Sequence, residues 1–172
     1  MRVVASHLMR GGLVDDVGAI FAGHGLGPGE LQLVITETAG IRDPQFAADA
    51  INAMRAMGVG IVLGEFGSGK STLRDLLQLP IDVVTIHPRL VQDAPRQDKL
   101  QKLLGALNFV AGSLDLSVGA DGVDDADQLR VARALEYSYA QGDALCRRQS
   151  LDELESPGGV LRQARELIDS IR

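Results

Sequence analysis

The sequence is short of cysteine, lysine and aromatic residues, and none of its apolar runs is long enough to cross a membrane. Its one cysteine, Cys146, excludes an internal disulfide and fits a reducing cytoplasm. Aromatic residues make up 3% of the chain, lysines number three and the formal net charge is −6. We therefore expect no nucleic-acid partner, because such a partner favours a basic face or stacking rings. Since a membrane helix needs about 20 apolar residues, we also expect no membrane partner and a cytoplasmic location.

The 172 residues suit one domain, and the hydrophobic content of 45% supports a real core. Apolar runs typical of buried strands alternate with stretches that repeat apolar residues at helical spacing. The expected strands are 2–6, 31–36, 59–63, 81–86, 114–118 and 139–145, and the segment 88–96 is expected to be a loop. This alternation predicts an α/β fold with about six mainly parallel strands. The order fits a TIM-like (β/α) barrel that is incomplete, because eight full units need about 250 residues.

Polar residues stand at the carboxyl ends of the expected strands, where barrels of this kind carry their functional groups. These residues are Ser6, Glu37, Glu65, His87, Asp121 and Gln141. The sequence therefore predicts that any site lies at this end of the strands.

The stretch 64–71 matches a phosphate-binding loop, G-x-x-x-x-G-K-[ST], through Gly64, Gly69, Lys70 and Ser71. In such a loop, glycines let backbone N–H groups face a polyphosphate, the lysine neutralises it and the serine holds magnesium. An apolar strand before the stretch and a helix after it provide the required context. No apolar run ending in aspartate stands where magnesium would need it. A P-loop nucleotide binder is therefore kept as an alternative function.

Several further motifs cover nearly the whole chain. They are VVAS at 3–6, LVITE at 33–37, EFGSG at 65–69, STL at 71–73, LPID at 79–82, ADGVD at 120–124 and QGD at 141–143. In residue type, order and spacing they resemble the EAL family, the cyclic-di-GMP phosphodiesterases of bacterial signalling. The resemblance implies a modified barrel with one antiparallel strand. It also implies a site in which two divalent metals activate water for attack on a phosphodiester.

The chain departs from the family pattern at positions that carry this chemistry. The family's site asparagine is Val4, the first aspartate of its D-D-F-G motif is Gly64, and the lysine of its K-I-D motif is Thr85. The aspartate of that last motif is His87. The segment with the E-x-L signature would lie before residue 3, and the chain has none of it. Compared with the family, this chain therefore lacks most of the expected ligands.

Three carboxylates remain as vestigial positions of the implied site. Glu37 is unchanged, Glu65 is one methylene longer than the family's aspartate, and Asp121 is one methylene shorter than the family's glutamate. Hard divalent ions need several oxygen ligands in fixed geometry. We therefore expect no metal, no cofactor and no catalytic residue, with Mg²⁺ or Mn²⁺ relevant only if some activity survives.

These expectations describe a catalytically inactive EAL-like signalling or regulatory module, not an enzyme, that acts through protein contacts. A cyclic-di-GMP receptor and a weak cyclic-di-GMP phosphodiesterase are the alternatives. The expected layout is an N-terminally truncated EAL-like domain over 1–156 and an amphipathic helix over 157–172, packed on the domain or on a partner. That helix carries Leu161, Leu167, Ile168 and Ile171 on one side. Because the first expected strand would be left as an open edge, we expect a homodimer; the sequence does not identify another protein partner.

Overall fold

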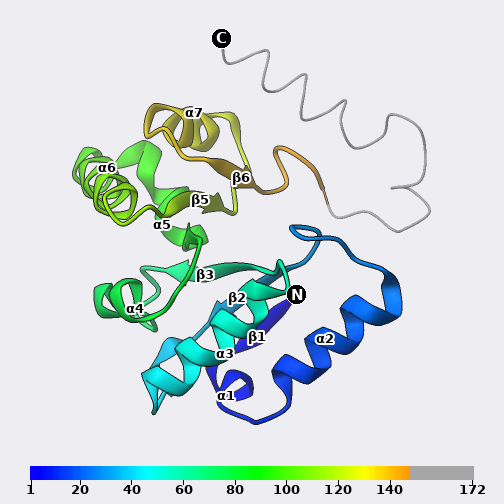
Figure 1. The fold of residues 1–172 in the computed structure, drawn as a ribbon. Helices are drawn as coiled ribbons and strands as arrows, with labels where there is room; N and C mark the ends of the chain where they lie inside the picture. The colour runs from blue at the N-terminus through cyan, green and yellow to red at the C-terminus, as the bar shows by residue number, and fades with distance from the viewer. Residues whose placement is uncertain (148–172) are drawn as a thin grey trace, which may run out of the picture. The chain divides into compact units, whose positions relative to one another are not determined.

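The computed structural model describes residues 1–147, and in it six strands alternate with helices to give the expected α/β fold (Figure 1). The chain divides into two compact units, Met1–Thr85 and the part that begins at Ile86. The first unit contains β1 (Arg2–Val4), α1 (Ala5–Leu8), α2 (Leu13–His24), β2 (Gln32–Thr36), a 3-10 turn (Thr38–Gly40), α3 (Pro44–Ala56), β3 (Gly60–Phe66) and α4 (Leu73–Gln78). β4 (Val83–Ile86) spans the boundary. The second unit contains α5 (Pro88–Asp93), a 3-10 turn (Ala94–Arg96), α6 (Asp98–Gly112), β5 (Ser117–Asp121), α7 (Ala126–Ala134) and β6 (Tyr139–Gln141).

In the first unit, β1, β2 and β3 pair side by side, and all their pairings are parallel. Val3 stands opposite Ile35, and Ile35 opposite Leu63. Parallel neighbours need a crossover, which α1 and α2 provide between β1 and β2, and α3 between β2 and β3. α3 packs on β3, and α2 packs against α3. The side chains with no exposed surface in this unit include Val17, Leu33, Ile35, Ala47, Ile51, Met54, Ile61 and Leu63.

Local signals fix the two ends of α3, the helix that connects β2 and β3. The Asp43 carboxylate accepts hydrogen bonds from the backbone N–H groups of Gln45 and Phe46, each at 3.1 Å, which caps the start of α3. At the other end, Gly58 has φ +90°, and a Cβ there would lie 2.6 Å from Cα of Pro28. Only glycine fits such a turn. β3 therefore starts at a defined residue, and its carboxyl end comes to lie beside the carboxyl end of β2.

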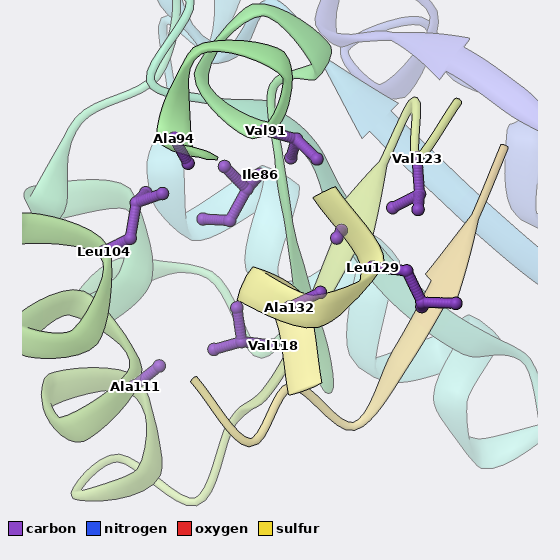
Figure 2. Packing of buried hydrophobic residues seen from close by; sticks show 10 residues of the cluster. Ile86, Val91, Ala94, Leu104, Ala111, Val118, Val123, Leu129 and Ala132 are labelled. Carbon is purple, nitrogen blue, oxygen red and sulfur yellow. The ribbon is translucent and has the colours of Figure 1, made fainter. Parts of the chain in front are cut away.

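The second unit has its own core, which Figure 2 shows from close by. Side chains from β4, α5, the 3-10 turn, α6, β5, the loop after β5 and α7 gather in it, namely Ile86, Val91, Ala94, Leu104, Ala111, Val118, Ala120, Val123, Leu129 and Ala132. β5 and β6 are parallel, with Gly119 opposite Tyr139. A Cβ on Gly119 would lie 2.3 Å from the Tyr139 ring. This close packing requires glycine at that position of β5.

Several local expectations are wrong. The strands expected over 2–6 and 139–145 end at Val4 and Gln141, and residues 5–8 form helix α1. The segment expected as a loop over 88–96 is helical, because Pro88 occupies the first position of α5 and the Nδ1 atom of His87 accepts a hydrogen bond from the Arg89 N–H at 3.2 Å. The strand expected over 114–118 is displaced and runs over Ser117–Asp121. The helix expected over 157–172, and the domain boundary before it, lie outside the described residues. No helix within residues 1–147 is long and apolar enough to span a membrane.

Candidate functional site

Two of the three vestigial carboxylates lie in the first unit, at the carboxyl ends of neighbouring strands. Glu37 directly follows β2, and Glu65 is the next-to-last residue of β3. Both have left-handed backbones, with φ 60° and 58°. This conformation is uncommon for residues other than glycine, and it costs about 1–3 kcal/mol. At the carboxyl ends of two neighbouring strands there is therefore a glutamate with a left-handed backbone conformation.

Each of these two glutamates forms an ion pair with a cation of the same unit. The Lys70 ammonium donates a hydrogen bond to Oε1 of Glu37. The Arg2 guanidinium donates to Oε1 of Glu65 at 2.8 Å. The hydrogen bond and the negative charge of Glu37 raise the pKa of Lys70. All four side chains keep contact with solvent, so water screens these pairs and each contributes little to the free energy of folding.

The position beside Glu65, where the family has an aspartate, is crowded by side chains of β2. Gly64 lies inside β3 and is buried. A Cβ there would lie 2.7 Å from Cγ1 of Val34 and 3.2 Å from Cγ2 of Thr36, both on β2. On the other side of β3, the Glu65 backbone N–H donates to Oγ1 of Thr85 at 3.3 Å. Valine and threonine side chains therefore fill the surroundings of this glycine.

The loop after β3 is held against the 3-10 turn that follows β2. The Lys70 carbonyl accepts hydrogen bonds from Oγ1 of Thr38 at 3.1 Å and from the Ala39 N–H at 3.3 Å. The Asp75 carboxylate accepts from the Thr72 N–H at 2.6 Å. It also lies 2.8 Å from Oγ1 of Thr38, whose single proton is shared between this carboxylate and the Lys70 carbonyl. A cavity of about 290 Å³ lies beside these contacts. Its lining includes Thr38, Ile41, Pro44, Lys70, Arg74 and Gln78.

The residues that match the phosphate-loop pattern are divided between a strand and the loop that follows it. Gly64 is part of strand β3, whereas Gly69 has φ +87° in the loop with no atom within 4 Å of its Cβ position. Ser71 precedes the helix, since α4 begins at Leu73 with Thr72 as its N-cap. The ammonium of Lys70 is paired with Glu37. Oγ of Ser71 is buried and has no hydrogen-bond partner within the described part of the chain.

Ser6 lies in the first unit, exposed on helix α1 and not at the end of a strand. The remaining sequence candidates lie in the second unit. Asp121 ends β5 and is buried. Burial, together with the negative charge of Asp121, raises the pKa of Tyr139 to about 12. His87 uses its Nδ1 atom to cap α5, and Gln141 ends β6 with an exposed side chain. Across residues 1–147, no three histidine, cysteine, aspartate or glutamate side chains gather as they would around a metal ion.

The sequence-based reasoning missed the partners of the two glutamates and the residues that hold the loop. The spacing of Thr72 and Asp75 is that of a capping box, which the structure contains, so this signal was available. The pairing of Arg2 with Glu65 joins residues 63 positions apart, and no local pattern marks it.

Comparison with known proteins places these observations in a family. The model of the EAL domain matches residues 1–148. The curated relatives include an uncharacterized signaling protein of Caulobacter vibrioides, 34% identical over 76% of this chain and 16% of its own length. The cyclic di-GMP phosphodiesterase NbdA of Pseudomonas aeruginosa is 30% identical over 88% of this chain and 19% of its own length. The chain thus spans less than a quarter of the length of these relatives.

Solved structures agree with the sequence matches. The PaMucR phosphodiesterase, solved in complex with c-di-GMP, has a TM-score of 0.80 at 28% identity and covers 89% of this chain and 62% of its own. An EAL domain protein from Listeria monocytogenes has a TM-score of 0.81 at 22% identity over 90% of this chain and 62% of its own, which supports the fold alone. The fold, the motifs and these matches together show that the chain belongs to the EAL domain family.

Proposed function

We propose that this chain is an EAL-family module that does not hydrolyse cyclic-di-GMP and works by contact with other protein chains. One observation carries the proposal: the two glutamates at the ends of β2 and β3 pair with Lys70 and Arg2. In the family, these positions would hold divalent metals. In this chain, the side chains of Lys70 and Arg2 each contact Oε1 of one of these carboxylates, which a metal would have to displace.

The side chains that could act as metal ligands in the first unit support the same proposal. A divalent ion of the Mg²⁺ type prefers six oxygen ligands at close to octahedral angles. Val4 offers no lone pair, Gly64 offers no side chain, and Val34 fills the space beside that glycine. Thr85 is buried, and its Oγ1 already accepts the Glu65 N–H. The residues present therefore do not fit a two-metal centre, and we derive no hydrolytic step for them.

A cyclic-di-GMP receptor is the second candidate function. It is favoured by relatives of the same fold that have been solved in complex with this nucleotide, among them PaMucR at 28% identity. A receptor needs affinity for the ligand and no metal chemistry, so paired glutamates alone do not exclude it. Direct titration with the nucleotide separates the two candidates.

The P-loop alternative is weaker on physical grounds. A phosphate-binding loop presents its glycine-rich backbone to the phosphates and leads directly into a helix. Gly64 lies within a strand, Ser71 precedes the N-cap of α4, and Lys70 is paired with Glu37. Moreover, α4 has only six residues. We propose that this loop shapes the surface of the unit and does not bind nucleotide triphosphates.

Calorimetric titration with cyclic-di-GMP, ATP and GTP, each with and without Mg²⁺, tests these proposals. We expect no binding of ATP or GTP tighter than about 100 μM, a free energy near −5.5 kcal/mol. Tighter ATP or GTP binding that Lys70→Ala abolishes would establish the P-loop function. Saturable binding of cyclic-di-GMP without hydrolysis would make the chain a receptor. The absence of heat with all three ligands supports the regulatory module.

A further inference from the structure

We propose that the cavity beside the 3-10 turn after β2 and the start of α4 binds a small zwitterion, an aliphatic α-amino acid. This inference goes beyond the proposed function and does not depend on it. It is argued from the first unit alone and uses neither Glu37 nor Glu65. The charges that line the cavity, its apolar wall and its volume each support it.

Two opposite charges line this cavity without neutralising each other. Arg74 and Asp75 both belong to the lining, and they are successive residues of α4. Successive side chains of a helix do not face each other, and none of the ion pairs within residues 1–147 includes either residue. A ligand with charge of one sign would be attracted by one residue and repelled by the other. A zwitterion satisfies both.

The carboxylate of such a ligand would find two donors on one face of α4. The guanidinium of Arg74 is exposed and has no hydrogen-bond partner within the described part of the chain. It can hold a carboxylate through two parallel N–H bonds. Gln78 also lines the cavity. Because it lies four residues after Arg74, its side-chain amide is a neighbour on the same face and supplies a further N–H.

The ammonium group of the ligand would find an acceptor in Asp75. Three groups contact this carboxylate: Oγ1 of Thr38 at 2.8 Å, the N–H of Thr72 at 2.6 Å and Oγ1 of Thr72 at 3.1 Å. All three contacts are made to Oδ2, and nothing within residues 1–147 donates to Oδ1. Oδ1 is therefore left to accept from a ligand. Because the carboxylate is already held in place, binding costs little side-chain entropy.

The rest of the lining and the size of the cavity indicate the side chain of the ligand. Ile41, Pro44 and Leu79 give the cavity an apolar wall, and no aromatic ring lines it. Its volume of about 290 Å³ is at the low end of the range for small-molecule pockets. The cavity therefore suits one amino acid, and an aliphatic side chain would gain from contact with the apolar wall.

NMR titration of the full 172-residue chain, labelled with ¹⁵N, tests for this site with L-leucine as the probe. We expect saturable shifts confined to residues 38–44 and 69–79, with a dissociation constant of about 1 mM or tighter. Isoamylamine lacks the carboxylate and N-acetyl-L-leucine lacks the ammonium group, so each should bind at least about tenfold more weakly. The inference is overturned if leucine, isoleucine, valine and methionine give no shifts at about 10 mM. Binding of isoamylamine as tight as that of leucine would also overturn it.

Arg74→Gln tests the role of the guanidinium. Because Arg74 is exposed, the variant should unfold at the temperature of the wild-type chain. Its dissociation constant for leucine should rise at least about tenfold, whereas the weak binding of isoamylamine should not change. Arg10→Gln is the matched control, since Arg10 is exposed in the same unit and does not line the cavity. If Arg74→Gln binds leucine as tightly as the wild-type chain does, the inference is wrong.

Discussion

Cyclic-di-GMP incubated with this chain and Mn²⁺ should remain essentially uncleaved. Any hydrolysis should be at least about a thousandfold slower than that by the PaMucR phosphodiesterase assayed beside it. The expectation follows from groups that act together. Lys70 and Arg2 each contact one oxygen of Glu37 and Glu65, so a metal would have to displace them, and Val4 and Gly64 supply no further side-chain ligand. Losing several groups that act as a unit leaves little catalysis, because their effects are not additive.

The measurement is chromatographic detection of the linear dinucleotide product over several hours. The double variant Arg2→Ala/Lys70→Ala is the informative control, because it frees both glutamates and leaves Val4 and Gly64 as they are. We expect it to be inactive as well. Turnover by the wild-type chain near 1 per second, a rate ordinary for an enzyme, would refute the proposed inactivity.

Gly64→Asp, which would supply the carboxylate that the family has at this position, should destabilise the folded chain by about 3 kcal/mol or more. The new Cβ would lie 2.7 Å from Cγ1 of Val34, inside a buried strand. The side chain would also bring a carboxylate into a region lined by Val34 and Thr36. Thermal and urea unfolding of the variant beside the wild-type chain measures the effect.

Three further variants separate the causes. Gly64→Ala retains the steric clash without the charge, and it should cost about 1–3 kcal/mol. Combining it with Val34→Ala should cost less than the sum of the two single changes, since the clash is with that side chain. Gly23→Ala, at a position of α2 with no atom within 4 Å, should be neutral or stabilising. If Gly64→Asp folds as stably as the wild-type chain, the space beside β3 is open and this interpretation is wrong.

The sequence predicts the frame of the fold because apolar periodicity and motif spacing are local properties. The motif LVITE places Glu37 at the end of β2, and the stretch EFGSG places Glu65 at the end of β3, as observed. The segment 88–96 was predicted to be a loop, yet proline is well suited to the first position of a helix, and α5 begins at Pro88. Leu73 and Leu77 follow helical spacing with Leu76, but only Leu76 is buried.

The contacts that decide the proposed function cannot be predicted in this way. The pair Lys70–Glu37 and the pair Arg2–Glu65 depend on the reach of long side chains between separate segments. The closure of the space at Gly64 depends on Val34 of the neighbouring strand. A substitution such as aspartate to glycine is visible in the sequence. What fills the space it leaves is visible only in the structure.

Titration with Mn²⁺ followed by electron paramagnetic resonance tests the central claim most directly, because protein-bound Mn²⁺ loses the strong signal of the free ion. The titration uses about 100 μM chain and Mn²⁺ up to roughly 1 mM, a concentration at which a binding free energy of only about −4 kcal/mol would already be detected. We expect the signal of free Mn²⁺ to match that of the same concentration in buffer. Loss of signal for two ions per chain with a dissociation constant below about 100 μM, reversed in Glu37→Gln and Glu65→Gln, would show that these glutamates hold metals and contradict the claim.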